Sequence, residues 1–567
     1  MRRIFNFFNL FHKELSGVHQ AALLLAFSGI ASKILALLRD RLLASSFGAG
    51  RTLDIYYAAF RLPDFLYNLS LFAVASTALI PIFLEKFSKE EKKAKEFFNS
   101  VFTLFLLVIA GLVVVSFFFL PFLTDLLGPG FSLEEKAKLS GLTKILLLSP
   151  LFLGLSSLVS SVIQSFRRFF IYALSPILYN LGIISGVVIF YPWLGERGLA
   201  WGVVLGALLH FLVQLPSLWK LGFLPRPTFK ILFSEIKKLF SFSLPRTIGL
   251  TINQLVFWVI TALASILASG SIAIFNLSYN LQSIPVALVG LSYSVAAFPG
   301  LSRLFLKNQR KEFLSYVYIA TRHIVFWSLP ISVLFIVLRA HIVRLVLGAG
   351  AFSWVDTRLT AAGLAIFSVS VISQGFILLF VRAFYAGGKT LRPLLINLIS
   401  GVFIILASFL LPFLVKEFGW GNFLGRVLRL SDISEITILI LVLAFSSGSI
   451  LNAFLLWIYF KKDFASPAEV PPKAGRRRDG AFFQMFLASL TMGILAYLGL
   501  RMFNNIFDNR TFLGLLAQGG LAGLMGMAGW FFVLKIMKNS ELEEILSALK
   551  RKFWKTPVVA SEPEQLP

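Results

Sequence analysis

The chain has 567 residues, of which 57% are hydrophobic and only 14% charged, with 61 phenylalanines. Soluble domains carry about 25% charged residues, so this composition excludes a soluble fold and indicates many apolar helices of about 20 residues that span a membrane. The sequence contains no cysteine and only five scattered histidines. It therefore excludes disulfides, thiolate ligands and a thiol nucleophile, and we expect no metal and no cofactor.

The formal net charge of +26 is typical of a membrane protein whose basic loops face anionic lipid. We therefore expect membrane lipids, and no nucleic acid, as the partners of these basic residues.

The predicted elements begin with an interfacial N-terminal segment in which Arg2, Arg3 and Lys13 are mixed with phenylalanines. About fourteen hydrophobic runs of spanning length follow, so the predicted fold class is an all-α integral membrane protein. The predicted spans are 19–46, 52–86, 97–124, 138–167, 171–194, 198–220, 236–268, 271–305, 313–345, 357–386, 391–416, 435–460, 480–503 and 511–537.

Matching motifs predict an internal repeat over the first twelve spans. The stretch Leu127-Gly128-Pro129-Gly130 matches Leu347-Gly348-Ala349-Gly350, and the pair Pro176 and Asn180 matches Pro393 and Asn397. The offset is 220 residues for the first match and 217 for the second, which covers six predicted helices. Because six is an even number, the two halves have the same orientation and form two parallel six-helix repeats, with two C-terminal helices outside them.

The repeat divides the chain into six predicted parts. These are an interfacial segment, an N-lobe, a C-lobe, a Pro- and Arg-containing cytoplasmic linker, two appended helices and a cytoplasmic tail. Their bounds are 1–18, 19–230, 231–463, 464–479, 480–537 and 538–567. Two similar bundles that face each other have the geometry of alternating access, with the substrate held between them.

Basic residues are concentrated in one set of alternate loops. That set includes the lysines between Lys86 and Lys95 and the run from Arg476 to Arg478, whereas the opposite set contains more acids, such as Glu134 and Glu135. Both termini lie on the basic side. Because basic loops stay in the cytoplasm, we predict that the N- and C-termini are both cytoplasmic.

Ionisable residues at bilayer depth are costly unless they are paired or reach water. The first two predicted helices contain the densest group of them: Lys33, Arg39, Asp54, Arg61 and Asp64. We predict that these side chains line a cavity for an anionic substrate such as a phosphate or pyrophosphate, for which arginine supplies a planar fork of donors. Asp54 would orient Arg39 or Arg61, or take part in ion or proton coupling.

Other polar features favour a structural interpretation. Arg41, Arg246 and Arg382 are expected to reach the interface or to form structural pairs. His210 is expected to be a satisfied packing residue, and the sequence from Gly387 to Thr390 a cytoplasmic turn. The glycines between Gly519 and Gly529 in the last predicted helix indicate either close helix packing or a groove for a lipid chain.

The order of motifs in the first two helices resembles the lipid II flippase family MurJ/MviN, of the multidrug/oligosaccharidyl-lipid/polysaccharide exporter superfamily. The residues that carry the resemblance are Ser32-Lys33, Leu38-Arg39-Asp40, Phe47-Gly48-Ala49-Gly50, Asp54, Phe60-Arg61-Leu62-Pro63, Pro81 and the later Leu267-Ala268-Ser269-Gly270-Ser271. The segment 31–81 is the most specific part.

This resemblance implies a function and a location. Family members move an undecaprenyl-pyrophosphate-linked peptidoglycan precursor, lipid II, from the inner to the outer leaflet. The chain would then be a monomeric, multi-pass flippase of the bacterial inner membrane rather than an enzyme. The resemblance also implies two six-helix lobes around a cationic cavity, and a groove for the lipid tail between the last two helices. It assigns Lys33, Arg39 and Asp54 to the family's functional positions.

The sequence departs from the family pattern at several of these positions. Lys33 replaces an arginine, and the helix-eight arginine is replaced by Asn280, which follows Tyr279. A basic pair is replaced by Tyr67 and Asn68, and a Glu-Gly pair by Phe72 and Ala73. Asn280 and Tyr67 still offer hydrogen bonds to a sugar or phosphate, but with less electrostatic attraction.

These departures leave two functions open. The first is a lipid II flippase that works by alternating access, with the headgroup bound by Lys33, Arg39 and Arg61. The alternative is a flippase or exporter of another polyprenyl-linked saccharide, or of a small molecule. A scaffold without transport activity would tolerate neutral substitutions at Arg39 and Asp54, and a membrane-embedded enzyme would need a nucleophile or acid–base pair that the sequence does not present.

Overall fold

The computed structural model describes residues 18–70, 76–433, 435–464 and 480–553. The regular structure in these residues is helical and contains no strand, which confirms the predicted all-α class. Twelve helices of the described chain are long and apolar enough to cross a membrane. Their bounds are Glu91–Phe118, Leu133–Ser165, Phe169–Leu194, Glu196–Lys220, Thr247–Ile266, Ser271–Leu306, Arg310–Val337, Trp354–Ala386, Leu391–Glu417, Thr437–Phe464, Ala481–Phe503 and Phe512–Ile536.

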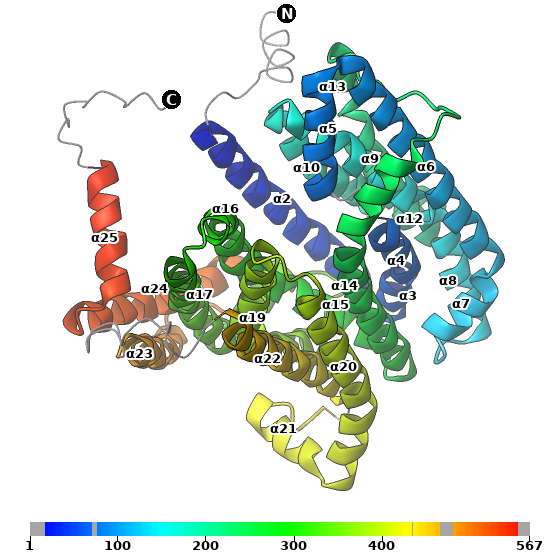
Figure 1. Ribbon diagram of the computed structural model, residues 1–567. Coiled ribbons are helices and arrows are strands. Elements are labelled where there is room, and N and C mark those ends of the chain that lie inside the picture. The colour runs from blue at the N-terminus through cyan, green and yellow to red at the C-terminus, as the bar shows by residue number, and fades with distance from the viewer. Residues whose placement is uncertain (1–17, 71–75, 434, 465–479, 554–567) are drawn as a thin grey trace, which may run out of the picture. The chain divides into compact units, whose positions relative to one another are not determined.

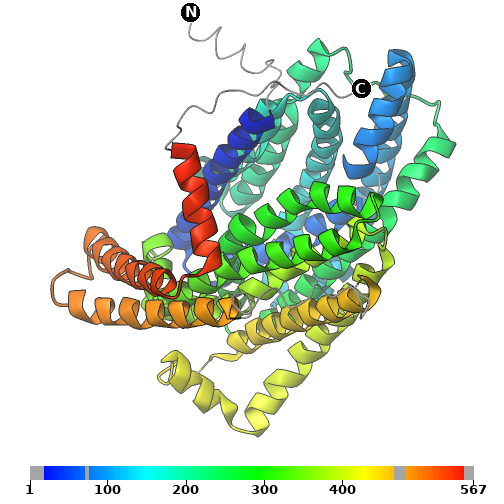
Figure 2. The ribbon, with the colours of Figure 1, turned by 60° about the vertical axis from the view of Figure 1, so that its left-hand side comes forward.

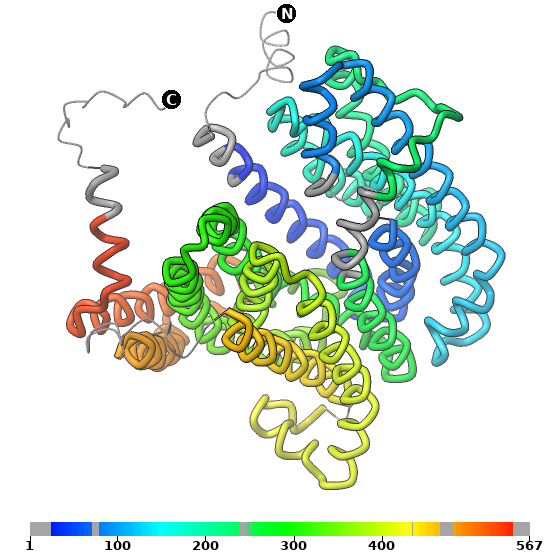
Figure 3. The backbone as a smooth tube through the Cα atoms, in the orientation of Figure 1, coloured from blue at the N-terminus to red at the C-terminus, as the bar shows by residue number. Residues whose placement is uncertain are grey.

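These helices coincide with the last twelve predicted spans, whereas the helices of the first two predicted spans are not among the twelve. The predicted span 19–46 is a continuous helix, α2 (Val18–Phe47), which Figure 3 traces to its end near α3. The predicted span 52–86 is divided into α3 (Arg51–Ala59), α4 (Arg61–Ser70) and α5 (Ser76–Lys89). Both segments contain several charged residues, and neither is among the twelve helices, so the count of fourteen spans stays a prediction.

Contacts divide the chain into two compact units. Unit 1 comprises residues 1–284, 343–370 and 388–456, and unit 2 comprises residues 285–342, 371–387 and 457–567. The predicted bounds of the two six-helix lobes stay a prediction.

Unit 1 contains the first half of the chain. After α5 its helices are α6 (Glu91–Phe118), α7 (Leu120–Leu127), α8 (Leu133–Leu146), α9 (Leu148–Ser165), α10 (Phe169–Ser185), η2 (Gly186–Phe190), α11 (Tyr191–Leu194), α12 (Glu196–Leu212), α13 (Leu215–Lys220), α14 (Phe233–Ile266) and α15 (Ser271–Pro285). It also contains α20 (Leu391–Glu417) and α21 (Trp420–Leu428). The helices α18 (Arg339–Val346), α19 (Trp354–Ala386) and α22 (Thr437–Phe464) have residues in both units.

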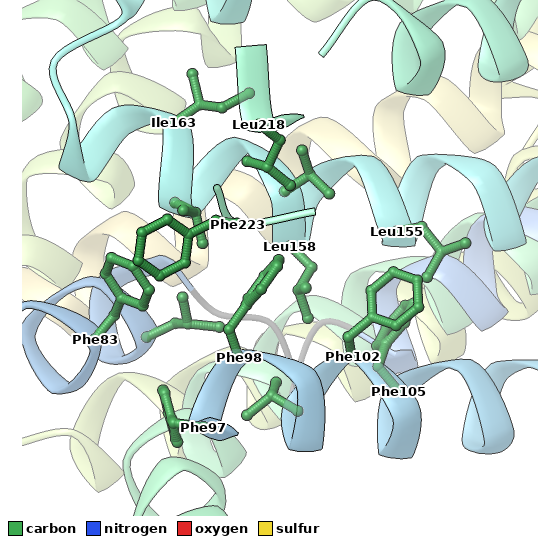
Figure 4. Packing of buried hydrophobic residues seen from close by; sticks show 14 of the residues in the cluster. Phe83, Phe97, Phe98, Phe102, Phe105, Leu155, Leu158, Ile163, Leu218 and Phe223 are labelled. Carbon is green, nitrogen blue, oxygen red and sulfur yellow. The ribbon is translucent and has the colours of Figure 1, made fainter. Parts of the chain in front are cut away.

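A phenylalanine-rich cluster forms a core between α5, α6 and α9 in unit 1 (Figure 4). The ring centroids of Phe83 and Phe223 are 5.3 Å apart in an edge-to-face arrangement, and Phe83, Phe97 and Phe105 are at most 1% exposed. Aromatic side chains bury large apolar areas, and edge-to-face pairs add about 0.5–1.5 kcal/mol beyond that burial. The abundance of phenylalanine therefore serves internal packing as well as contact with lipid.

Glycine allows α10 and α12 to pack side by side (Figure 1). A Cβ atom added to Gly182 would lie 2.2 Å from Cα of Gly206, and one added to Gly202 would lie 2.3 Å from Cα of Gly186. Small residues permit this approach of two backbones, which is the usual way in which helices associate in a membrane. The close packing holds α10, the helix that contains Asn180, against α12.

Unit 2 is built on α17 and the C-terminal helices. Its members include η3 (Val286–Leu291), α16 (Ser292–Leu306), α17 (Arg310–Val337), α23 (Ala481–Phe503), α24 (Phe512–Ile536) and α25 (Ser540–Phe553). Figure 2 shows α23 and α24 as an antiparallel pair, with α25 continuing from the end of α24. Arg322 of α17 forms an ion pair with Glu541 of α25, and their side chains are 8% and 4% exposed. This buried pair holds the last helix against α17.

Candidate functional site

A cavity of about 350 Å³ lies in unit 1 among α2, α3, α4, α10, α14 and α15. Its lining contains two arginines, one aspartate, four tyrosines and four side-chain amides, with apolar residues between them. Both predicted lobes contribute to it. The lining residues are Arg39, Leu43, Tyr56, Tyr57, Phe60, Arg61, Asp64, Tyr179, Ile183, Asn253, Gln254, Phe257, Asn276, Tyr279 and Asn280.

Arg39 reaches the cavity from α2 but bonds to residues of the chain. Its Nε and Nη2 donate to Oδ1 of Asp40 at 2.9 and 2.7 Å, and its Nη1 donates to Oδ1 of Asn180 at 3.3 Å. The guanidinium is 20% exposed and the Asp40 carboxylate only 4%. The positive charge predicted for this position is therefore present, and a neighbouring carboxylate balances it.

Arg61 is buried between α14 and α15. Its Nε donates to the hydroxyl of Thr261 at 2.8 Å, and its Nη2 donates to Oδ1 of Asn276 at 2.6 Å. The guanidinium carbon also lies 5.2 Å from the centroid of the Phe257 ring, within the range of a cation–π contact. These hydrogen-bond partners are neutral, so they leave the net charge of Arg61 unbalanced.

Asn280 and Asp64 are the other predicted site residues in the lining. Nδ2 of Asn280 donates to Oδ2 of Asp40 at 3.1 Å. The residue at the position of the family's helix-eight arginine thus joins the network of Arg39. Asp64 lines the cavity near Arg61 and attracts it electrostatically. The predicted residues Arg39, Arg61, Asp64 and Asn280 therefore come together at one site.

Lys33 lies two turns before Arg39 on α2 and is half-buried. It is close enough to Arg39 and Asp40 to interact with both electrostatically, but it is not among the residues that line the cavity. The lining contributed by α2 therefore begins only at Arg39.

Asp54 lies apart from the cavity lining and is fully buried. Its carboxylate accepts hydrogen bonds from the backbone N–H of Gly270 at 2.6 Å and of Ala273 at 2.9 Å. Arg51 lies 3.8 Å from the same carboxylate. Asp54 thus binds the first turn of α15, where the unpaired N–H groups of a helix attract an anion. The sequence predicted Arg39 or Arg61 as its partner, whereas these contacts join it to Gly270, Ala273 and Arg51.

Three turns of unit 1 meet around Asp54, and we call this contact the turn junction, formed by residues 45–54, 267–273 and 348–356. Gly270 has a φ of +92°, and a Cβ atom there would lie 1.9 Å from the carbonyl oxygen of Ala49. The backbone N–H of Ala351 donates to the carbonyl of Ser45 at 2.8 Å, and that of Ala49 donates to the carboxylate of Asp356 at 3.2 Å. The junction therefore consists mainly of backbone groups.

The other departures from the family pattern are only partly described. The hydroxyl of Tyr67 and that of Ser157 share a hydrogen bond of 3.0 Å, and Nδ2 of Asn68 donates to the carbonyl of Asp64 at 2.8 Å. Neither residue lines the cavity. Phe72 and Ala73 lie outside the described residues.

Several structural predictions can be compared with contacts. Arg41 donates to the carbonyls of Leu345 and Val346 at 2.6 and 3.3 Å, and Arg382 hydrogen-bonds to Ser294. His210 shares a hydrogen bond of 2.6 Å with Ser156. These three residues therefore have partners within the chain.

Gly526 and Gly529 pack closely on α23. A Cβ atom added to either would lie within 2.8 Å of Met492 or Leu495. These contacts support the prediction of close helix packing for this part of the last span.

Sequence reasoning missed the uncharged half of the site. The tyrosines Tyr56, Tyr57 and Tyr179 and the amides Asn253, Gln254 and Asn276 line the cavity, but none was predicted. Asn253-Gln254 stands alone in an apolar stretch of α14, and an isolated amide pair at bilayer depth is itself a signal of an aqueous surface. In the described chain no group of three or more His, Cys, Asp or Glu residues is arranged to hold a metal ion.

The sequence is similar to that of known transporters. The family model described as "Lipid II flippase MurJ" matches residues 43–518. The probable lipid II flippase MurJ of Buchnera aphidicola subsp. Acyrthosiphon pisum is 31% identical over 73% of this chain and 80% of its own length. The probable lipid II flippase MurJ of Thermotoga maritima is 28% identical over 91% of this chain and 96% of its own length.

Solved structures are similar over most of the chain. A lipid II flippase MurJ in an inward closed conformation superimposes with a TM-score of 0.70 at 25% identity, and covers 90% of this chain and 99% of its own. An inward-facing multidrug resistance MATE family transporter of the MOP superfamily has a TM-score of 0.62 at 13% identity over 78% of this chain and 96% of its own. The second likeness concerns the fold alone.

Proposed function

The chain belongs to the lipid II flippase family MurJ, and we propose that it carries lipid II from the inner to the outer leaflet of the bacterial cytoplasmic membrane by alternating access. The observation that carries the proposal is the cavity of unit 1, where polar side chains of α2, α4 and α15 meet within a bundle of apolar helices. Such a cavity holds a polar headgroup that the surrounding lipid cannot solvate.

Transport in this mechanism depends on side chains that replace water around the headgroup. The arginines, amides and tyrosine hydroxyls of the lining supply donors and acceptors at bilayer depth. The polyprenyl tail needs no such site, because it remains in the apolar interior of the membrane. Because the cargo crosses without covalent change, we propose that the protein is a transporter and not an enzyme. We also propose that it acts as a monomer.

The turn junction is proposed to close the cavity toward the outer leaflet. This assignment rests on the predicted orientation with both termini in the cytoplasm, which places the turns at 47–50, 267–270 and 348–352 on the outer side. Opening on that side would have to break the two hydrogen bonds from Gly270 and Ala273 to Asp54. The role proposed for Asp54 is therefore to stabilise the closed end, and Lys33 is proposed to attract the anionic headgroup toward Arg39.

Complementation tests the proposed cargo. The chain is expressed in a bacterium whose own lipid II flippase can be depleted, and growth is followed after depletion. We expect the wild-type chain to restore growth. We expect Arg39→Gln to fail at an equal membrane level, because it leaves the buried Asp40 carboxylate without its cationic partner. Arg426→Gln, which changes an exposed arginine of α21, is the matched control and should restore growth.

The same experiment tests a second candidate cargo. Asn280 stands at the position of a family arginine, and Arg39 is paired with Asp40. Both features reduce the positive charge of the site and favour a different polyprenyl-linked saccharide with a smaller negative charge. Failure of the wild-type chain at a normal membrane level would support that cargo and contradict lipid II. Growth with Arg39→Gln equal to the wild type would show that Arg39 is not part of the transport site.

A further inference from the structure

We infer that the cavity recognises the saccharide of its lipid-linked cargo through uncharged hydrogen-bonding groups and aromatic rings, while its two arginines bind groups of the chain itself. This inference rests on the proposed function, because a lipid-linked saccharide is the cargo that brings a sugar to this depth of the membrane. The inference names the saccharide as the part of the headgroup that the cavity binds. It assigns the binding of that saccharide to the uncharged residues of the lining.

The donors of Arg39 are largely occupied. Three of its N–H groups point to Asp40 and Asn180. An arginine that binds a phosphate needs two parallel N–H groups free for the phosphate oxygens. Here Nε and Nη2 already bind one carboxylate oxygen, so a phosphate could use this fork only by displacing Asp40.

Displacement of Asp40 is opposed by its surroundings. The Asp40 side chain is 4% exposed, and its second oxygen accepts a hydrogen bond from Asn280. A carboxylate released from Arg39 would remain buried and lose its counter-charge. A phosphate in its place would also be repelled by the negative charge of Asp40.

Arg61 is committed in the same way, although its partners are neutral. Its Nε and Nη2 bind Thr261 and Asn276 on two different helices, and its side chain is 8% exposed. Its position between α14 and α15 makes it a cross-link of the cavity wall. The network of Arg39 and that of Arg61 therefore position the lining.

The uncharged lining supplies what a sugar needs. The hydroxyl of Tyr57 is buried and has no hydrogen-bond partner within the described residues. A buried hydroxyl without a partner is costly unless a bound group or water satisfies it. The amides of Asn253 and Gln254 face the same cavity, and each offers both a donor and an acceptor to the hydroxyl and acetamido groups of a sugar.

Aromatic rings provide the apolar part of the site. The Tyr56 and Tyr57 rings have centroids 5.6 Å apart, and the Tyr279 ring packs edge-to-face on Phe257 with centroids 5.0 Å apart. Both pairs line the cavity. Rigid rings with a polar tip suit a ligand that has one apolar face and a rim of hydroxyl groups, as a sugar ring has.

The size of the cavity agrees with one sugar unit. Its volume of about 350 Å³ lies at the lower end of the roughly 300–1,000 Å³ that pockets for small molecules occupy. We therefore assign the cavity to a saccharide ring of the headgroup.

Equilibrium binding to the full-length protein in nanodiscs tests the inference. The ligands are lipid II, which carries the saccharide, and undecaprenyl pyrophosphate, which has the same tail and pyrophosphate without it. We expect lipid II to bind at least roughly tenfold more tightly than undecaprenyl pyrophosphate. Raising the salt concentration should change the lipid II affinity little, because surface charges that salt screens do not form the site.

Variants separate the two parts of the headgroup. Tyr57→Phe removes only the unpartnered hydroxyl, and we expect it to weaken lipid II binding roughly three- to tenfold and to leave the binding of undecaprenyl pyrophosphate unchanged. Gln254→Leu should act in the same direction. Tyr316→Phe, which changes an exposed tyrosine of α17, is the matched control for Tyr57→Phe, and thermal unfolding of each variant shows that it is folded.

Three results would overturn the inference. Equal affinities for the two lipids would show that the saccharide is not recognised. Unchanged lipid II binding in both Tyr57→Phe and Gln254→Leu would exclude these side chains. Absence of lipid II binding by the folded wild-type protein would contradict the proposed function itself, and this result differs from the first, in which lipid II binds as well as the lipid without a saccharide.

Discussion

Two aspartates of the second predicted span, Asp54 and Asp64, have opposite environments. Asp54 is 0% exposed and accepts two backbone hydrogen bonds from α15. Asp64 lies ten residues later, lines the cavity and attracts Arg61, which lies one turn earlier on the same helix α4. Both occur in the same charged segment of the sequence, yet one belongs to the turn junction and the other to the cavity.

The difference shows what decides the role of an ionisable residue at bilayer depth. Burial of a charge is tolerated where its partners are fixed donors, and the residue is then structural. A charge that faces a cavity is solvated by water or by cargo, and it is then available for binding. The partners, and not the residue type or its depth, separate the two roles.

Loss of the Asp54 carboxylate should have the largest effect. Asp54→Ala leaves the buried N–H groups of Gly270 and Ala273 without acceptors, which costs about 1–3 kcal/mol for each group. We therefore expect a destabilisation of about 2–6 kcal/mol, measured as a lower midpoint of thermal unfolding of the purified protein. Asp54→Asn retains one acceptor oxygen and should be intermediate. An unfolding midpoint of Asp54→Ala equal to that of the wild type would contradict this role.

Substitution of Gly270 in the turn junction should have the next largest effect on stability. Gly270→Ala places a Cβ atom 1.9 Å from the carbonyl oxygen of Ala49 at a φ of +92°, and we expect it to cost about 2–5 kcal/mol. Gly388→Ala is the matched control, because Gly388 has a φ of +71° and no heavy atom within 4 Å of the added Cβ. Equal unfolding midpoints of the two variants would show that the approach to Ala49 does not matter.

Substitution of Arg61 should reduce the stability of the protein less than substitutions in the turn junction. Arg61→Lys keeps the charge but loses the planar fork that reaches Thr261 and Asn276 together. We expect a loss of about 1–3 kcal/mol in stability and a roughly tenfold slower transport of lipid II in proteoliposomes. Arg426→Lys on exposed α21 should change neither quantity. Wild-type transport in Arg61→Lys would contradict the assignment of Arg61 to the cavity wall.

Neutralising Asp64 should affect stability less than the same change at Asp54. Asp64→Asn keeps the shape of the side chain and removes an attraction to Arg61 on the same helix. We expect a change of about 1 kcal/mol or less in the free energy of unfolding, against a clearly larger loss for Asp54→Asn. If the two Asp→Asn variants unfolded at the same temperature, the contrast between the two aspartates would be wrong.

The smallest effect is expected at the exposed ion pair between Arg358 and Asp432. Arg358 donates to both carboxylate oxygens at 2.5 and 2.6 Å, and this hydrogen bonding lowers the pKa of Asp432 to about 2. Because the pKa is lower in the folded protein than the ordinary value of about 4, the pair stabilises the fold above pH 4. That contribution is lost as the pH falls from about 4 to about 2.

The pH dependence of unfolding checks this prediction. Asp432→Asn and the wild type should unfold at the same temperature near pH 2, and a small difference in favour of the wild type should appear above pH 4. A difference that is equally large at pH 2 and pH 7 would show that the carboxylate charge is not responsible.

The sequence predicted the class and most of the helices because apolar periodicity and length are local signals. The last twelve spans agree with helices of the structure. The second span does not, because helix α3 ends at Ala59 and α4 begins at Arg61, beside Pro63. The charged residues of that segment lie on separate short helices. The hydropathy of the segment does not show where one of these helices ends and the next begins.

The site was predicted in part for the same reason. Arg39, Arg61 and Asp64 were recognisable because charge is rare in apolar helices. Their partners were not, since Thr261 and Asn276 lie about 200 residues away from Arg61 along the chain and nothing local links them. The tyrosines were missed because tyrosine in a membrane helix is as typical of the lipid interface as of a binding site.

The most direct test is the rate at which the purified protein moves lipid II between the leaflets of proteoliposomes. We predict that the wild-type chain and Tyr316→Phe accelerate this movement equally over protein-free liposomes. Tyr57→Phe and Arg61→Lys, with unchanged amounts of folded protein, should both be slower. No acceleration by the wild type, or equal rates in all four proteins, would contradict transport through the cavity of unit 1.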